Sequence, residues 1–222
     1  RLVPDEGKDK AEISSQVIGL LQAASDTPID VRRVDFVGPQ VGEELTEDGG
    51  LAVLYALIAI LIYVALRFEY RFSLGAVAAL VHDVIITLGI FSLLQLDFDL
   101  SVLAALLAVI GYSLNDTIVV FDRVRENFRK IRKRTSIEIV NTSINQTISR
   151  TLMTSFTTLL VLLSLFFLGG EAIHAFALAL IIGVLVGTYS SIYVATTSAL
   201  ALGISRSDLL LPDKEGEDMA RP

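Results

Sequence analysis

The sequence contains no cysteine and only two histidines, so it has few groups for covalent or metal chemistry. The absence of cysteine excludes disulfide bonds and thiolate–metal sites. The two histidines, His82 and His174, lie in different segments and do not have the spacing of metal ligands. We therefore expect neither a metal nor a cofactor.

Charge is also scarce, and it is confined to a few short segments. Asp, Glu, Lys and Arg make up 19% of the 222 residues, whereas 53% are hydrophobic and the mean hydropathy is +0.63. This composition is too apolar for an ordinary soluble domain. The net charge of −7 comes mainly from acidic residues near the two ends of the sequence, and we expect no nucleic-acid partner.

Five runs are long and apolar enough to cross a bilayer as helices, since a span needs about 20 mostly apolar residues. They lie at about residues 49–66, 72–96, 100–121, 149–168 and 175–202. In the fifth run, Gly183 and Gly187 form a pair of small residues that permits close helix packing. The sequence therefore predicts a mainly α-helical, polytopic transmembrane bundle.

The connectors between these runs predict the orientation of the bundle. Segment 122–148 opens with seven Lys and Arg side chains, and it continues as an amphipathic helix expected to lie along the membrane surface. The positive-inside rule places this segment in the cytoplasm. The connectors at 96–99 and 169–174 have no Lys or Arg and belong outside. Residues 1–48 are then periplasmic, the tail 204–222 is cytoplasmic, and a further span is expected before the first residue.

The first 48 residues resemble a piece of a small α+β domain. Residues 10–24 carry apolar side chains at helical spacing. Residues 29–37 are rich in β-branched side chains, which favours a strand. The sequence GPQVGEEL at 38–45 predicts a turn that leads into the first span. We expect this segment to be the C-terminal part of a periplasmic domain.

The third run carries a carboxylate, Asp116, within the stretch GYSLNDTIVVFDRVREN at 111–127. It lies about two helical turns, roughly 9 Å, inside the cytoplasmic end of its span. An ionised carboxylate there costs at least about 2.5 kcal/mol, so it requires a cation, water or a proton. Tyr112, Asn115 and Thr117 could supply polar contacts. Asp116 is therefore a candidate for reversible protonation.

The cation expected beside Asp116 is Arg150, at the start of the fourth run. The third run leaves the membrane on the side where the fourth enters, so the two charges lie at a similar depth. Asn145, Ser149 and Thr154 give this entry a polar character and could line a wet face with Arg150. The alternative is that Arg150 extends to the inner membrane interface and makes no specific contact.

His82 and Asp83 interrupt the second run, roughly 15 Å from its inner end. Histidine titrates near neutral pH, so this pair could act as a proton relay. Adjacent residues on a helix point to different faces, however. The alternative is therefore that the pair makes a structural polar contact that fixes helix packing.

Four motifs, VGPQVGEEL, HDV, GYSLNDTIVVFDRVREN and NQTISRTLMTS, follow one another along the chain. In these motifs the chain resembles the SecF family, subunits of the bacterial SecD–SecF export complex in the RND superfamily. The resemblance implies six spans, of which this chain carries the second to the sixth. It also implies that Asp116 and Arg150 act in proton coupling together with an aspartate of SecD.

The function implied by the resemblance is that of a non-enzymatic accessory subunit of the Sec machinery. Such a subunit uses the proton-motive force with SecD to promote preprotein translocation across the cytoplasmic (inner) membrane. The implied partners are SecD, the Sec translocon channel, YajC, preprotein substrates, membrane lipid and protons.

Three other functions are compatible with the residues alone. An RND-type proton-driven transporter of small molecules or lipids would use the same chemistry in its spans. An intramembrane aspartyl protease would use Asp83 and Asp116 as its two carboxylates, but the third run has no GxGD motif. In a passive scaffold, the charges would only hold the bundle together.

Overall fold

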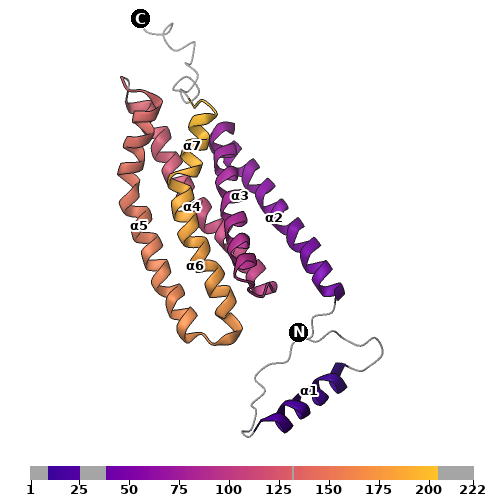
Figure 1. The fold of residues 1–222 in the computed structure, drawn as a ribbon. Coiled ribbons are helices and arrows are strands. Elements are labelled where there is room, and N and C mark those ends of the chain that lie inside the picture. Colours follow the sequence, from indigo (N-terminus) through magenta and orange to yellow (C-terminus); the bar gives the residue numbers. More distant parts are fainter. Residues whose placement is uncertain (1–9, 26–38, 132, 205–222) are drawn as a thin grey trace, which may run out of the picture. The chain divides into compact units, whose positions relative to one another are not determined.

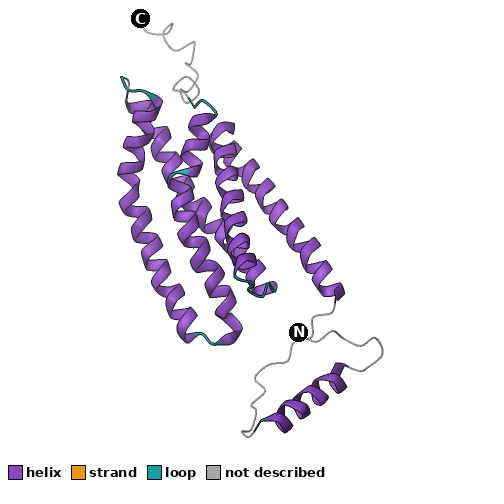
Figure 2. Ribbon diagram, viewed as in Figure 1, coloured by secondary structure: helices purple, strands orange, loops and turns teal. Residues whose placement is uncertain are grey.

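The computed structural model describes residues 10–25, 39–131 and 133–204 (Figure 1). The chain divides into two compact units, one ending at Gly50 and the other beginning at Leu51. Helices are the only regular elements in the described ranges, and Figure 2 shows no strand there.

The first unit contains helix α1 (Lys10–Ala24) and the beginning of α2 (Pro39–Arg67). Helix α1 confirms the helix expected at 10–24, whereas the strand predicted at 29–37 lies outside the described residues. The turn predicted at 38–45 differs from the structure, which is helical from Pro39 onwards. Proline at the first position of a helix loses no hydrogen bond, because the N–H that it lacks has no partner there.

The described residues contain five helical segments that are long and apolar enough to cross a membrane. They are α2 from Glu47, α3 (Tyr70–Leu93), α4 (Leu100–Lys130), α5 (Ser136–Leu168), and α6 (Glu171–Ile192) followed by α7 (Val194–Ala201). These segments confirm the five predicted spans. Helices α4 and α6 pack against each other and each contacts α3 and α5, while α2 is mostly exposed.

Helix α4 is longer than the apolar run that predicted it. Asp99 caps its first turn by accepting hydrogen bonds from the N–H groups of Ser101 (2.9 Å) and Val102 (3.0 Å). The helix then continues through the charged residues to Lys130. Its 31 residues give a length of about 46 Å. The hydrocarbon core is about 30 Å thick, so the charged end of α4 extends beyond it.

Segment 135–148, expected to lie along the membrane surface, is in fact the first part of α5 and continues without a break to Leu168. Thr135 begins this helix with a capping box, in which its backbone N–H donates to the Glu138 carboxylate (2.9 Å) and its hydroxyl accepts from the Glu138 N–H (3.4 Å). No Gly or Pro follows before Leu168. The break expected near residue 148 is absent because polar side chains do not by themselves end a helix.

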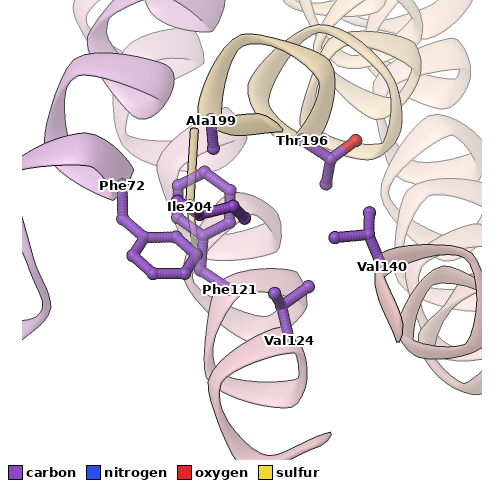
Figure 3. A pocket seen from close by; sticks show the side chains of 7 residues that line it. All are labelled: Phe72, Phe121, Val124, Val140, Thr196, Ala199 and Ile204. Carbon is purple, nitrogen blue, oxygen red and sulfur yellow. The ribbon is translucent and has the colours of Figure 1, made fainter. Parts of the chain in front are cut away.

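The α2–α3 and α4–α5 connections lie at one end of the bundle, here called the basic end, where the largest apolar core is found. Seven side chains meet in the part of this core drawn in Figure 3: Phe72, Phe121, Val124, Val140, Thr196, Ala199 and Ile204. The rings of Phe72 and Phe121 meet edge to face, with centroids 4.8 Å apart. These seven side chains leave no space between them for a water molecule, so this part of the core is closely packed.

Two close approaches fix the fifth span against its neighbours. A Cβ placed on Gly183 of α6 would lie 2.1 Å from Val109 Cγ2 of α4. A Cβ placed on Gly75 of α3 would lie 2.8 Å from the carbonyl oxygen of Ala195 in α7. The span is interrupted between these contacts at Tyr193, where α6 ends and α7 begins. The small residues therefore allow the helix backbones to approach closely, as expected for Gly183.

Candidate functional site

Asp116 is buried on the side of α4 that faces α5, with 4% of its surface exposed. Tyr112 and Asn127 share this side of α4 because they lie one turn before and three turns after Asp116. Tyr112 Oη donates to Ser155 Oγ of α5 (3.2 Å), and Asn127 Nδ2 donates to Ser143 Oγ of α5 (2.8 Å). Asp116 therefore lies between two hydrogen bonds that join α4 to α5.

Within the described residues, three buried oxygen atoms of α4 and α5 have no hydrogen-bond partner: Asp116 Oδ2, Thr117 Oγ1 and Thr151 Oγ1. The pairing of Tyr112 with Ser155 in antiparallel helices places Thr151 opposite Asp116. An unsatisfied buried polar group costs about 1–3 kcal/mol. Such groups are usually completed by water, an ion or a proton. The site therefore has unfilled hydrogen-bonding capacity around its carboxylate.

Arg150 lies next to Thr151 in α5, and its side chain is exposed. It is near enough to interact electrostatically with Asp116. No direct ion pair joins the two side chains in the described part of the chain. The predicted pair is thus brought to the same region, with the carboxylate buried and the guanidinium accessible.

A chain of hydroxyl groups continues from Tyr112 across the bundle. Ser155 Oγ, which accepts from Tyr112, is 2.7 Å from Thr188 Oγ1 of α6. This chain joins α4, α5 and α6. Sequence reasoning missed Ser155 and Thr188, because Ser and Thr in a helix usually bond to carbonyl groups of the same helix. The available signals were the position of Ser155 at the end of the motif NQTISRTLMTS and the position of Thr188 within an apolar run.

Several of the polar residues predicted around the site are exposed rather than buried: Asn115, Asn145, Ser149 and Thr154. Thr154 Oγ1 bonds to carbonyl groups of its own helix, those of Arg150 (3.2 Å) and Thr151 (2.9 Å). Exposed polar side chains in a membrane span are rare against lipid and usually face water or another helix. These exposed polar positions of α4 and α5 are therefore suited to contact with water or a partner.

The second predicted pair, His82 and Asp83, forms hydrogen bonds with residues other than Asp116. Asp83 is fully buried, and its Oδ2 accepts hydrogen bonds from Ser113 of α4 (2.6 Å) and Ser190 of α6 (2.7 Å). Its Oδ1 lies 3.1 Å from His82 Nδ1. The two carboxylates of an aspartyl protease share a proton between them. Here each carboxylate has a different environment, and no hydrogen bond joins them.

In the described residues, no group of three His, Asp or Glu side chains could hold a metal ion.

The family of this chain follows from comparison with known proteins. The model of the family described as "Protein export membrane protein SecD/SecF, C-terminal" matches residues 17–205. The chain belongs to the SecD/SecF family.

Individual relatives within the SecD/SecF family match almost the whole chain. The protein translocase subunit SecF of Vibrio alginolyticus is 56% identical over 217 residues, which are 98% of this chain and 69% of the relative. The SecF subunit of Escherichia coli O157:H7 is 50% identical over 221 residues, which are 98% of this chain and 68% of the relative. These matches confirm the SecF resemblance inferred from the four motifs.

Crystal structures from the SecD/SecF family share this fold. SecDF from Thermus thermophilus, described as a translocon-associated membrane protein, matches 91% of this chain with a TM-score of 0.76 and 45% identity. SecDF in its super-membrane-facing form matches 88% with a TM-score of 0.70 and 43% identity. These matches cover 27% and 26% of the SecDF chains. The chain therefore corresponds to about a quarter of SecDF and about two thirds of the SecF relatives.

Proposed function

We propose that this chain is the main membrane part of an accessory subunit of Sec protein export, which uses the proton-motive force together with SecD. The observation that carries the proposal is Asp116, a buried carboxylate with an unpartnered oxygen beside the accessible Arg150, in a chain of the SecD/SecF family. The relatives are named translocase subunits, which supports a role in translocation rather than an enzymatic reaction.

In the proposed mechanism, Asp116 binds and releases a proton during each cycle. When it is ionised, its charge attracts Arg150 across the α4–α5 interface. When it is protonated, that attraction is lost and the two helices can shift relative to each other. The hydroxyl chain from Tyr112 through Ser155 to Thr188 would then carry the shift to α6. Alternation between these states would couple proton flow to movement of the outer segment and to preprotein translocation.

SecD is the proposed partner that contacts exposed polar side chains of α4 and α5 near Asp116. An aspartate of SecD would complete the proton path beside Asp116 and Arg150. The Sec translocon channel, YajC and preproteins remain proposed partners of the assembled complex. The proposed orientation keeps the basic end and the tail 204–222 in the cytoplasm and residues 1–48 in the periplasm, in agreement with the positive-inside rule.

Replacement of Asp116 by asparagine tests the proposed function. The full-length subunit, as wild type or Asp116→Asn, is expressed in cells depleted of their own SecF. Export of a secreted reporter is then measured with the proton gradient intact or collapsed. We expect wild type to restore gradient-dependent export and Asp116→Asn to lose it, because an amide of the same shape cannot exchange a proton.

The matched control is Asp122→Asn, the same substitution at an exposed position of α4. It should export like wild type. The proposed function is rejected if Asp116→Asn exports as well as Asp122→Asn and retains the same dependence on the gradient.

A further inference from the structure

A second buried carboxylate, Asp83, lies where α3, α4 and α6 meet. None of its surface is exposed, and the same holds for Ser113 and Ser190, the two serines that donate to its Oδ2. His82 is the titratable side chain in hydrogen-bond contact with it, and 29% of the His82 side chain is exposed. Two oxygens with three hydrogen-bond contacts form a well-satisfied carboxylate.

Glycine at position 187 is what lets α6 come close enough for this contact. A Cβ there would lie 3.1 Å from Ser113 Cβ and 3.6 Å from Asp83 Oδ2. The backbone of α6 therefore packs directly against Ser113 of α4 beside the carboxylate. Within α3, the Thr87 hydroxyl donates to the Asp83 carbonyl oxygen (2.8 Å). Asp83 thus links three helices at a single buried point.

The position of this link along α4 connects it to the proton-coupling site. Ser113 lies three residues before Asp116, which is one helical turn or about 4.5 Å along the axis. Ser190 lies three residues before Tyr193, where α6 ends. Asp83 therefore binds α4 about one turn from Asp116. It also binds α6 about one turn from Tyr193, where that helix ends.

The hydrogen bonds do not continue from Asp83 to Asp116. Ser113 and Ser190 both donate to the same oxygen of Asp83, and the further contact of Ser190 is with the Gly187 carbonyl oxygen (3.2 Å). Asp116 Oδ2 has no partner in the described part of the chain. A proton relay needs an unbroken series of groups that both accept and donate, which these serines do not provide toward Asp116.

We propose that Asp83 is a positioning residue that fixes α4 and α6 so that Asp116 is held at the depth and rotation required for proton coupling. This inference rests on the proposed role of Asp116. Asp83 acts through its serine contacts and does not carry the transported proton. This positioning role requires a hydrogen-bond acceptor at position 83, but it does not require a group that can gain or lose a proton.

Comparison of Asp83→Asn with Asp83→Ala tests this role in the full-length subunit expressed with SecD. The asparagine side-chain oxygen can still accept from both serines, and its NH₂ group can donate to neutral His82. We expect Asp83→Asn to keep most of the gradient-dependent export per assembled complex. Asp83→Ala leaves the Ser113 hydroxyl without its acceptor and leaves Ser190 with only the longer contact to the Gly187 carbonyl oxygen (3.2 Å). We expect it to lower that export about tenfold.

Serine variants provide a second test that does not alter the carboxylate. Ser113→Ala and Ser190→Ala each remove one donor, and each should lower gradient-dependent export about threefold to fivefold, less than Asp83→Ala. The matched control is Ser73→Ala, which likewise removes a buried serine hydroxyl, but from α3, where it donates to the Leu61 carbonyl oxygen (2.7 Å) and not to Asp83. It should leave the ratio of export with and without the gradient unchanged.

Three outcomes would overturn the inference. An Asp83→Asn loss as large as that of Asp83→Ala would make Asp83 a proton carrier. A lower amount of complex with unchanged export per complex would make Asp83 important for folding alone. Wild-type export by both serine variants would also reject it. Failure of the proposed function is a different result: in that case Asp116→Asn would itself support gradient-dependent export. If Asp116→Asn loses this export, any of the three outcomes above rejects only the role assigned to Asp83.

Discussion

The close approach of α6 to α4 makes a quantitative prediction for Gly183→Ala. The added Cβ would lie 2.1 Å from Val109 Cγ2 and 2.9 Å from Val109 Cβ. A change of rotamer moves the Cγ atoms of Val109 but leaves its Cβ in place, so no rotamer relieves both contacts. Ordinary carbon–carbon contact is about 3.5 Å or more. The two helices must therefore move apart around this point.

The cost of this movement follows from two opposing effects. Overpacking of a well-packed interior costs about 1–3 kcal/mol. Alanine favours a helix over glycine by up to about 1 kcal/mol, which offsets part of the strain. We expect the free energy of unfolding to fall by about 1–2 kcal/mol. For a chain of this size, the melting temperature should fall by about 2–8 °C.

The assay is thermal unfolding of the full-length subunit purified with SecD in detergent. Val109→Ala in the Gly183→Ala background removes the two Cγ contacts but leaves the Cβ contact at 2.9 Å. Val109→Ala should therefore cost less stability in the Gly183→Ala background than in wild type. Gly89→Ala is the control, because a Cβ at this glycine meets nothing within 4 Å. The close packing inferred for α4 and α6 is refuted if Gly183→Ala melts no lower than Gly89→Ala, or if Val109→Ala lowers the melting temperature as much in the Gly183→Ala background as in wild type.

Two further predictions concern the α4–α5 pair at the basic end. Asn127→Ala should lower the free energy of unfolding by about 1–3 kcal/mol, because buried Asn127 donates to Ser143 (2.8 Å) and Gln146 (2.9 Å). The exposed Asn115→Ala should change it by less than about 0.5 kcal/mol in the same unfolding assay. Thr135→Ala should cost about 1 kcal/mol by removing the cap of α5, whereas Thr135→Ser should keep it. Equal melting temperatures for the alanine and serine variants would contradict this role of the cap.

Hydropathy was sufficient to predict the membrane bundle. A helix in lipid satisfies all of its backbone groups internally, so long apolar runs have few alternatives to a spanning helix. The ends of the helices were harder to predict. In α4 and α5, charged and polar residues continue the helix beyond the apolar run, and only the cap at Thr135 marks where α5 begins. Hydropathy detects contact with lipid but not helical structure in water.

The candidate site was predictable in its charges but not in its hydrogen bonds. Asp116, Arg150 and Asp83 were recognisable because ionisable residues are rare in spans. The partners of Asp83 were not, since Ser113 and Ser190 resemble any other serine of an apolar run. Which helices meet at Asp83 depends on packing between segments that are distant in the sequence. One sequence cannot specify that packing without knowledge of the fold.

The length of the α4–α5 pair also has a mechanical consequence. Only five residues separate Lys130 from Ser136, and Asn127 binds α5 close to this connection, so the two helix ends form one stiff arm. The arm reaches about 21 Å along α4 from Asp116 to Lys130. A tilt of about 5° at Asp116 would move its tip by about 2 Å, estimated from this helical length. Because Val124 of α4 and Val140 of α5 are buried in the core at the basic end, such a movement of the arm would also displace the parts of α3 and α7 packed against it.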